Sequence, residues 1–260
     1  MEKTVVVSVV ANGITLITLN RPEAANALSI QMLSELREAI AACKFDPSVR
    51  CVLITGAGEK IFCAGADLKE RAGMDLSQVR KTVSLIRESI NELEALPQPV
   101  IAALNGVALG GGMELALACD IRIASETAKF GLTETSLGII PGAGGTQRLP
   151  RLLGKGRAKE LIFTARRVDA REAREIGLIE YVTPEDSLLD KALSIANQIV
   201  LNAPIAIAQA KFAIDKGMNV DLSTGLSIEQ NAYELTIPTK DRLEGIQAFK
   251  EKRPPVFIGE

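Results

Sequence analysis

The alternation of strand-like and helix-like segments over the first 125 residues most constrains the fold of this chain. Two β-branched runs, 4–10 and 14–19, flank Asn12-Gly13, a dipeptide typical of a tight hairpin turn. Helical spacing of apolar residues then alternates with short apolar runs, which predicts an α/β fold with a largely parallel sheet covered by helices. The predicted helices span 29–43, 76–95 and 113–119, and the predicted strands span 49–55, 100–104 and 121–124.

The last third of the chain has a different pattern. Past about Arg157 every periodic segment favours helix, and Pro204 and Pro238 are placed as helix starts. We therefore expect a core at residues 1–195 that carries the functional site, and an α-helical C-terminal region at residues 196–260. The helical segments are 157–163, 170–176, 187–201, 205–216, 222–235 and 242–250.

The composition excludes several classes of function. The 260 residues contain no histidine, so no mechanism here uses imidazole as a base, an acid or a metal ligand. Carboxylates must move the protons if the chain is a hydrolytic or lyase enzyme. With 30 basic and 32 acidic residues, the formal charge of -2 gives no electrostatic basis for binding nucleic acid or an anionic membrane.

Neither a targeting segment nor a metal motif is evident. Met1–Thr4 leads directly into a strand-like run, without a secretory, transit or membrane-spanning segment, so we expect a cytoplasmic protein. The cysteines form no CxxC pair and have no histidine partners, which argues against a metal site and favours buried free thiols. They are Cys43, Cys51, Cys63 and Cys119.

Two carboxylates follow glycine-rich or turn-like sequence. Glu114 follows the run Gly110–Gly112 and stands among apolar residues, where an unpaired carboxylate would cost several kcal/mol and have a raised pKa. The alternative for Glu114 is a structural ion pair with an arginine. Glu134 lies twenty residues later, before Thr135-Ser136-Leu137-Gly138, and taken by itself it is more typical of an ordinary loop acid.

Three loops of small residues could present free backbone N–H groups to a ligand. The loops at 63–67 and 110–112 could together form an oxyanion hole, which needs two donors converging from separate segments. The loop at 141–146 offers further N–H groups, enough to hold a water. Each loop could instead be a plain tight turn, and none matches GxGxxG or GxxxxGK[ST], so a nucleotide-phosphate site is not expected.

In order and spacing, four segments closely resemble the enoyl-CoA hydratase/isomerase (crotonase) family. The resemblance extends from Leu19-Asn20-Arg21-Pro22 to Phe249–Pro254 and is closest to the enoyl-CoA and methylglutaconyl-CoA hydratase branch. It implies a crotonase-like fold, a spiral core of sheets and helices with a helical C-terminal region. The four segments are 62–70, 110–120, 130–138 and 140–149.

The resemblance implies a catalytic role for five residues. The N–H groups of Ala64 and Gly111 would bind the thioester carbonyl and stabilise an enolate. Glu114 would act as the base on a water and Glu134 would deliver a proton to C2, while the Gly142 N–H helps to hold the water. Family members that only isomerise double bonds usually lack one of the two acids, so both together favour hydration.

The resemblance also implies where coenzyme A binds. CoA is part of the substrate, so no separate cofactor is expected. Its adenine would lie against the loop Ala64–Asp67, and residues from a neighbouring subunit would complete the site within trimers that pair into hexamers. For Arg21, Lys69 and Lys252 the alternative is solvated surface charge. The implied CoA-binding residues are Arg21, Glu23, Ala24, Gly65, Ala66, Asp67, Lys69 and, from the neighbour, Phe249 and Lys252.

The expected function is therefore that of a lyase, an enoyl-CoA hydratase of fatty acid metabolism, in which two glutamates add water to a 2-enoyl-CoA. A methylglutaconyl-CoA hydratase is the alternative. An isomerase or dehalogenase using the same enolate, a non-catalytic CoA-binding protein, and a nucleic-acid-binding relative are further alternatives. The retained carboxylate pair argues against the non-catalytic protein, and the near-zero net charge argues against nucleic-acid binding.

Overall fold

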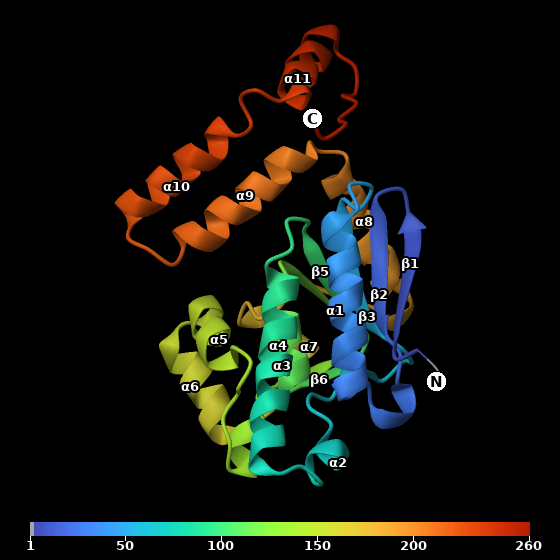
Figure 1. The fold of residues 1–260 in the computed structure, drawn as a ribbon, viewed down its shortest axis with the longest axis vertical. Helices are drawn as coiled ribbons and strands as arrows, with labels where there is room; N and C mark the ends of the chain where they lie inside the picture. The colour runs from blue at the N-terminus through green and yellow to red at the C-terminus, as the bar shows by residue number, and fades with distance from the viewer. Residues whose placement is uncertain (1–2) are drawn as a thin grey trace.

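The computed structural model of the chain describes residues 3–260, so residues 1 and 2 of the predicted core lie outside the described part. It has a mixed α/β core, from which the C-terminal helices project (Figure 1). The predicted opening hairpin is confirmed: β1 (Val5–Ala11) pairs antiparallel with β2 (Ile14–Leu19), and Gly13 takes a φ of 75° at the turn. That φ is readily accessible to glycine, which lacks a Cβ.

Six strands form the larger sheet, in the order β1-β2-β3-β5-β7-β10, and every pair after β1–β2 is parallel. Side chains of β3 alternate between the two faces, as the pleat of a strand requires. Val52 and Ile54 pack toward α1 (Ile30–Phe45) and α3 (Leu76–Glu94), while Leu53 packs toward α8 (Leu188–Val200). The strands after the hairpin are β3 (Cys51–Gly56), β5 (Val100–Leu104), β7 (Ile121–Ser125) and β10 (Tyr181–Thr183).

A second sheet of four short strands was not predicted from the sequence. Its order is β4-β6-β8-β9, with β4–β6 and β6–β8 parallel and β8–β9 antiparallel. Strands of two or three residues are too short to produce a period-two pattern, which explains why the sequence did not reveal them. They are β4 (Ile61–Cys63), β6 (Val107–Leu109), β8 (Lys129–Gly131) and β9 (Val168–Asp169).

The two long helices α1 and α3 begin at side-chain caps that the sequence carries. Ser29 caps α1 by accepting from the Met32 N–H at 3.2 Å, and Asp75 forms a capping box with Gln78 at the start of α3. The helices and single turns up to residue 187 are η1 (Pro22–Ala24), α1 (Ile30–Phe45), α2 (Leu68–Arg71), α3 (Leu76–Glu94), α4 (Gly111–Leu117), η2 (Glu134–Leu137), α5 (Gly145–Leu153), α6 (Lys155–Thr164), α7 (Ala170–Glu175) and η3 (Glu185–Ser187).

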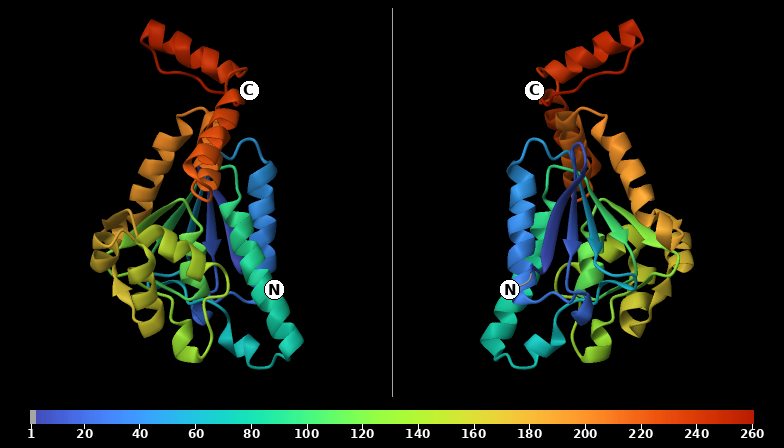
Figure 2. Two further views of the ribbon diagram at one scale, coloured as in Figure 1. Left: turned by 90° about the vertical axis from the view of Figure 1, so that its left-hand side faces the viewer. Right: turned by 90° about the vertical axis from the view of Figure 1, so that its right-hand side faces the viewer.

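The C-terminal helices confirm the predicted helical character of this part of the chain. Helix α8 packs on the large sheet through Ala192 and Ala196, so the predicted division at residue 195 falls inside a helix of the core. Helices α9 and α10 form a hairpin beside the core. Helix α11 lies at the end of the molecule that is farthest from the core (Figures 1 and 2). These helices are α8 (Leu188–Val200), α9 (Pro204–Gly217), α10 (Leu222–Glu234) and α11 (Lys240–Glu251).

Two further findings concern the described residues as a whole. Within residues 3–260, no single helix is long and apolar enough to cross a membrane; 185–200 and 204–217 would be so only together, with a bend of 106° between them. All four cysteines are buried and free, as predicted, and burial raises the pKa of the Cys51, Cys63 and Cys119 thiols to about 12.

Candidate active site

A cavity of about 1060 Å³ lies between the core and the helices around it. The ends of β4 and β6, the start of α4, the turn η2 and the loop 139–144 form one part of its wall, and α3 forms another. The predicted catalytic residues Ala64, Gly111, Glu114, Glu134 and Gly142 all line it. The structure therefore brings together side chains and backbone from four separate parts of the sequence.

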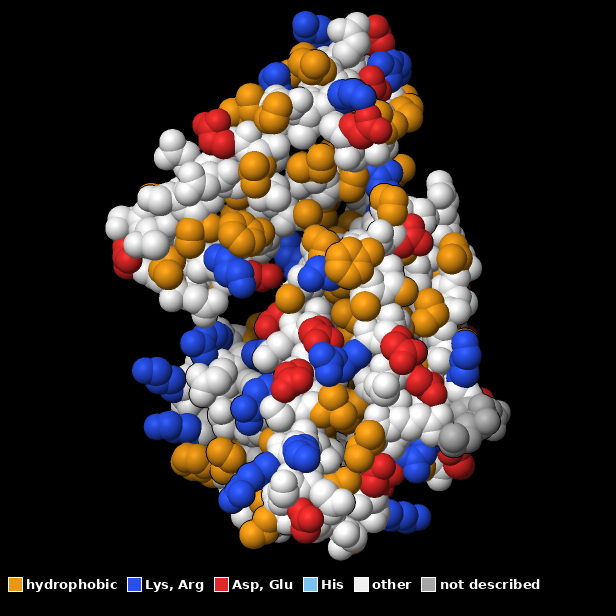
Figure 3. All heavy atoms as spheres, in the orientation of Figure 1, with side chains coloured by type: hydrophobic (Ala, Val, Ile, Leu, Met, Phe, Trp, Pro, Cys, Tyr) orange, Lys and Arg blue, Asp and Glu red, His pale blue; other side chains and the backbone are white. Residues whose placement is uncertain are grey.

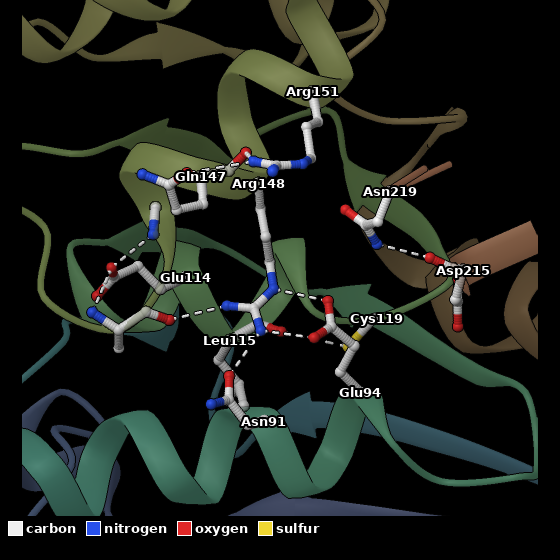
Figure 4. Close-up of polar contacts among 12 residues, drawn as sticks. Asn91, Glu94, Glu114, Leu115, Cys119, Gln147, Arg148, Arg151, Asp215 and Asn219 are labelled. Atoms are coloured by element: carbon white, nitrogen blue, oxygen red, sulfur yellow. Dashed lines mark hydrogen bonds and ion pairs between the residues drawn. The ribbon is translucent and has the colours of Figure 1, made fainter. Parts of the chain in front are cut away.

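Glu114 projects from the first turn of α4 and is 2% exposed. Its Oε1 accepts hydrogen bonds from the Ala143 and Gly145 N–H groups, both at 2.8 Å (Figure 4). No ion pair to Glu114 occurs within residues 3–260, so the arginine-pair alternative does not hold. Two N–H groups of the loop 141–146, those of Ala143 and Gly145, thus hold this carboxylate, and the Gly142 N–H, predicted to help hold a water, is not one of them.

The electrostatic setting of Glu114 is mixed. Burial raises its pKa, while the two backbone N–H groups and the charges of Arg148 and Arg87 lower it. Because these groups favour the ionised form, they limit the rise that burial alone would cause. Gly145 must be glycine, because a Cβ there would lie 3.1 Å from Glu114 Oε1 and 2.9 Å from Leu132 and Pro141.

Glu134 begins η2 and is 9% exposed. Its Oε2 is buried and has no hydrogen-bond partner among residues 3–260. Burial, followed by repulsion from Glu114, raises the pKa of Glu134 to about 7. Glu134 packs against Gly110, where a Cβ would lie 3.2 Å from Oε1 and where φ is +50°, so this position also suits glycine.

The backbone donors near the carboxylates differ from the prediction in one position. The Ala64 N–H donates to the Ala25 carbonyl at 3.1 Å, so this group is already committed. Across the described residues, neither the Ala66 N–H nor the Gly111 N–H has a hydrogen-bond acceptor. A Cβ placed on Gly111 would lie 3.7 Å from Ala66 N, so the two free N–H groups are neighbours. The pair able to bind an oxyanion is Ala66 and Gly111, and the assignment of Ala64 is corrected.

Sequence reasoning missed the arginine that supports the 143–145 loop. Arg148 donates to the Ala143 carbonyl at 2.8 Å, to Asn91 Oδ1 at 2.8 Å and to both oxygens of Glu94 at 2.7 Å (Figure 4). It thereby links α5 to α3. The only hint in the sequence is an arginine following a glycine-rich loop, which by itself does not reveal its partners.

The predicted CoA-binding residues lie in four places, three of them in the core. Gly65 and Ala66 line the cavity. Asp67 caps α2 and pairs with Arg21 at 2.6 Å, while Lys69 lies on the exposed side of the same helix. Glu23 and Ala24 lie in η1, directly after Arg21.

Phe249 and Lys252 lie at the end of α11, at the far end of the molecule from α2 (Figure 1). The chain therefore does not bring these two residues to its own cavity. A role for them requires a neighbouring copy, as the resemblance implied.

Metal chemistry has no obvious donor set here. Among residues 3–260, no group of three or more Cys, Asp or Glu side chains is arranged to hold a metal ion. The cavity offers two carboxylates in unlike environments and a pair of free backbone donors.

Comparison with known proteins identifies the family of this chain. Residues 10–260 match the family model for enoyl-CoA hydratase/isomerase. The chain belongs to this family.

Several relatives match over nearly the whole chain. The Bacillus subtilis protein YngF, provisionally named an enoyl-CoA hydratase/isomerase, is 61% identical over all of both chains. Human mitochondrial methylglutaconyl-CoA hydratase is 54% identical over 95% of this chain and 74% of its own length. A crystal structure of an enoyl-CoA hydratase from Bacillus anthracis superposes with a TM-score of 0.98 and 58% identity, covering 99% of this chain and 100% of the other. The crotonase fold is thereby confirmed.

Proposed function

We propose that the protein adds water across the 2,3-double bond of 2-enoyl-CoA thioesters to give 3-hydroxyacyl-CoA. The observation that carries the proposal is the pairing of two buried carboxylates of different pKa with two free N–H groups in one cavity. General acid–base catalysis needs one group that is protonated and one that is ionised, and different environments give two carboxyl groups the different pKa values that this requires.

The environments assign the two roles. Glu114 has two N–H donors and two nearby arginine charges, which favour its ionised form, so it is the base that takes a proton from water. Glu134 has an unpartnered oxygen and a pKa of about 7, so it keeps a proton near neutral pH and is the acid. This agrees with the roles that the resemblance implied.

The reaction then follows in balanced steps. The water oxygen bonds to C3 as Glu114 takes one of its protons, and the C2=C3 electron pair moves toward the thioester oxygen. The resulting enolate oxygen accepts from the Ala66 and Gly111 N–H groups, an arrangement for which loss of one donor costs about 3 to 4 kcal/mol in analogous sites. The enolate collapses as C2 takes the proton of Glu134. Return of the proton from Glu114 to Glu134 restores the enzyme.

A methylglutaconyl-CoA hydratase is the second candidate, favoured by the 54% identity to the human enzyme of that name. It differs from the first only in the acyl group. A pure isomerase is disfavoured because both carboxylates face the cavity, and nothing in the site favours nucleic-acid binding.

We also propose that the chain forms a homo-oligomer, with trimers pairing into hexamers. Supporting this, the C-terminal helices expose large apolar side chains that a monomer would leave in water. They include Ile214 (65% exposed), Met218 (77%), Leu222 (78%), Tyr233 (65%) and Phe249 (86%).

Hydration of crotonyl-CoA tests the proposed activity. The conjugated enoyl thioester absorbs in the near ultraviolet, and its absorbance falls as water adds, while mass spectrometry detects the 3-hydroxyacyl product. The proposal would be wrong if the purified protein left crotonyl-CoA unchanged and also failed to hydrate longer and carboxylated 2-enoyl-CoAs.

A further inference from the structure

A turn at residues 21–28 lies against the loop that carries the free Ala66 N–H. The turn follows β2 and contains η1, and the Arg21 carbonyl accepts from the Asn26 N–H at 2.9 Å. Ala25 and Asn26 take φ angles of 57° and 50°, in the left-handed region that L-residues rarely adopt. Asparagine tolerates this region better than most residues do, so the turn suits Asn26.

Backbone hydrogen bonds hold the loop 63–67 to this turn. Leu28 forms a parallel bridge with Ala66, in which it bonds to the residues before and after Ala66. The Ala66 N–H therefore points away from the turn, which explains why it has no acceptor among the described residues. The bonds are Ala64 N–H to the Ala25 carbonyl at 3.1 Å, Leu28 N–H to the Gly65 carbonyl at 2.8 Å, and Asp67 N–H to the Leu28 carbonyl at 3.4 Å.

The Asn26 side chain joins the turn to the strand that enters the loop. Its Nδ2 donates to the Ala57 carbonyl at 3.0 Å and to the Ile61 carbonyl at 2.9 Å. Its Oδ1 accepts from the Arg21 N–H at 2.9 Å, at the start of the turn. Because Ile61 begins β4 and this strand ends at the loop 63–67, one side chain fixes both the turn and the approach to the loop.

The other side of the loop is packed against the start of α4. Gly65 has a φ of +93°, and a Cβ there would lie 2.8 Å from the Leu109 carbonyl oxygen and 3.0 Å from the Gly111 nitrogen. The loop is thus confined between the turn and the segment that carries the second free donor. A shift of the turn therefore changes the position of the Ala66 N–H relative to the Gly111 N–H.

Asn26 has no route to the substrate of its own. The surface is hollowed beneath the α9–α10 hairpin (Figure 3), but Asn26 is 0% exposed and is not among the described residues that line the cavity. Any effect of Asn26 on the reaction therefore passes through the loop.

We propose that Asn26 is a positioning residue for the oxyanion-binding pair. By fixing the turn 21–28, it holds the Ala66 N–H where this group and the Gly111 N–H converge on one oxygen. This role rests on the proposed hydratase function, in which the two N–H groups stabilise the enolate. A displacement of about 1 Å in such a site costs about 100-fold in rate.

Two substitutions separate the side-chain bonds of Asn26 from its backbone conformation. Asn26→Gly suits the left-handed φ but removes the bonds to Arg21, Ala57 and Ile61. Asn26→Asp keeps the size and the acceptor, but it places an oxygen where the amide donated to two carbonyls.

Leu53→Ala is the matched control for a loss of stability. Leu53 is buried on the face of the large sheet that packs toward α8, and it is not among the described residues that line the cavity. Its truncation lowers the free energy of unfolding without touching the turn. Denaturant unfolding of the four proteins verifies that the control is destabilised and sets conditions in which all of them are folded.

The first readout is the kinetics of crotonyl-CoA hydration. Both Asn26 variants should lower kcat about tenfold or more with a smaller change in KM, because the enolate depends on the two donors more than the bound substrate does. Folded Leu53→Ala should keep the kcat of the wild type. If the folded Asn26 variants also kept it, Asn26 would only stabilise the fold and the inference would be overturned.

The second readout is the infrared stretching frequency of the thioester carbonyl of bound butyryl-CoA, labelled with carbon-13 at that carbon. Donation by two N–H groups weakens the C=O bond, so binding to the wild type should lower this frequency. The decrease should be smaller in both Asn26 variants and unchanged in Leu53→Ala. An equal decrease in all four proteins would contradict the proposed role. If Asn26→Asp does not fold, Asn26→Gly, which relieves the backbone, provides the result.

The two readouts also distinguish this role from the proposed function. Butyryl-CoA is saturated, so its carbonyl frequency is measured without turnover. If the wild type and the Asn26 variants hydrate crotonyl-CoA equally, the hydratase function stands and the role of Asn26 is removed. If the wild type hydrates no 2-enoyl-CoA, the proposed function fails, while the carbonyl frequencies still determine whether Asn26 positions the donors.

Discussion

The Ala143 N–H donates to Oε1 of Glu114 at 2.8 Å, while the carbonyl of the same residue accepts from Arg148. The backbone of one residue thus connects a buried carboxylate to an arginine that is itself held by α3. The position of the proposed base therefore depends on residues of three helices, α3, α4 and α5.

Arg148 is accordingly expected to position Glu114 and adjust its pKa. Arg148→Met removes a charge that lowers this pKa, so the acidic limb of the kcat/KM profile should move to higher pH. Glu94→Gln leaves the Arg148 charge uncompensated, so the limb should move to lower pH. pH profiles of both variants provide the measurement. Shifts in the same direction would contradict this electrostatic role.

The two carboxylates are expected to act as a unit. Glu114→Gln and Glu134→Gln should each lower kcat by at least about two orders of magnitude, with much smaller effects on acyl-CoA binding. The double variant should lose far less than the product of the two single losses, because one shared water requires both groups. Single-turnover rates of the three variants test this, and fully multiplicative losses would rule out the shared water.

Activity and stability should both depend on the Glu134 proton. Because the acid must be protonated, kcat/KM should decline as the pH rises through about 7. Between the ordinary carboxyl pKa of 4.5 and about pH 7, the folded protein holds a proton on Glu134 that the unfolded chain has released. The free energy of unfolding should therefore fall as the pH rises through this range.

The matched variant is Glu134→Gln, whose neutral amide has no carboxyl group to titrate. Its free energy of unfolding should exceed that of the wild type at pH 8, by up to about 3 kcal/mol, and the excess should shrink at pH 5. Thermal or denaturant unfolding at the two pH values measures the difference. A constant difference would mean that Glu134 titrates normally in the folded protein.

The Gly111 N–H is expected to stabilise the enolate. Gly111→Ala adds a Cβ near Leu28 Cδ1, at 3.3 Å, but keeps the N–H, whereas Gly111→Pro adds the same Cβ and removes the donor. Position 111 is the first residue of α4, where proline fits a helix. The proline variant should therefore show a kcat about 100-fold or more below that of the alanine variant. Folding and assembly are verified by circular dichroism and light scattering, and equal losses would argue against Gly111 as a donor.

Lys252 is expected to contribute to binding across a subunit boundary. Lys252→Glu should weaken CoA-ester affinity by a factor that shrinks with added salt, with little change in kcat at saturation, because the contact is remote from the reacting carbons. Truncation before Arg242 should abolish both assembly and activity, since it removes most of α11. A truncated chain that stays trimeric by light scattering and binds acyl-CoA normally would show that this region is dispensable.

Much of the fold and part of the site followed from the sequence. Strand β5 was predicted at its observed bounds, and the hairpin and the long helices were predicted within a few residues, because their hydrophobic periods and turn residues are local signals. Glu114 and Glu134 were singled out from their positions beside glycine-rich or turn-like sequence, and the family resemblance implied their catalytic roles. Both line one cavity in the structure.

Only the tertiary structure decided which groups meet. The Ala64 N–H donates to the Ala25 carbonyl, whereas the Ala66 N–H has no acceptor among the described residues. The sequence could not show this difference, since both alanines lie in one short loop. Nor could it place Arg87 against Gly142, 55 residues away. Local periodicity reports which face of an element is buried, whereas hydrogen-bond partners and pKa values depend on the surroundings that distant segments create. The amino-acid sequence thus determined the elements and the carboxylates, and their packing determined which backbone donor is free and which carboxyl has its pKa raised to about 7.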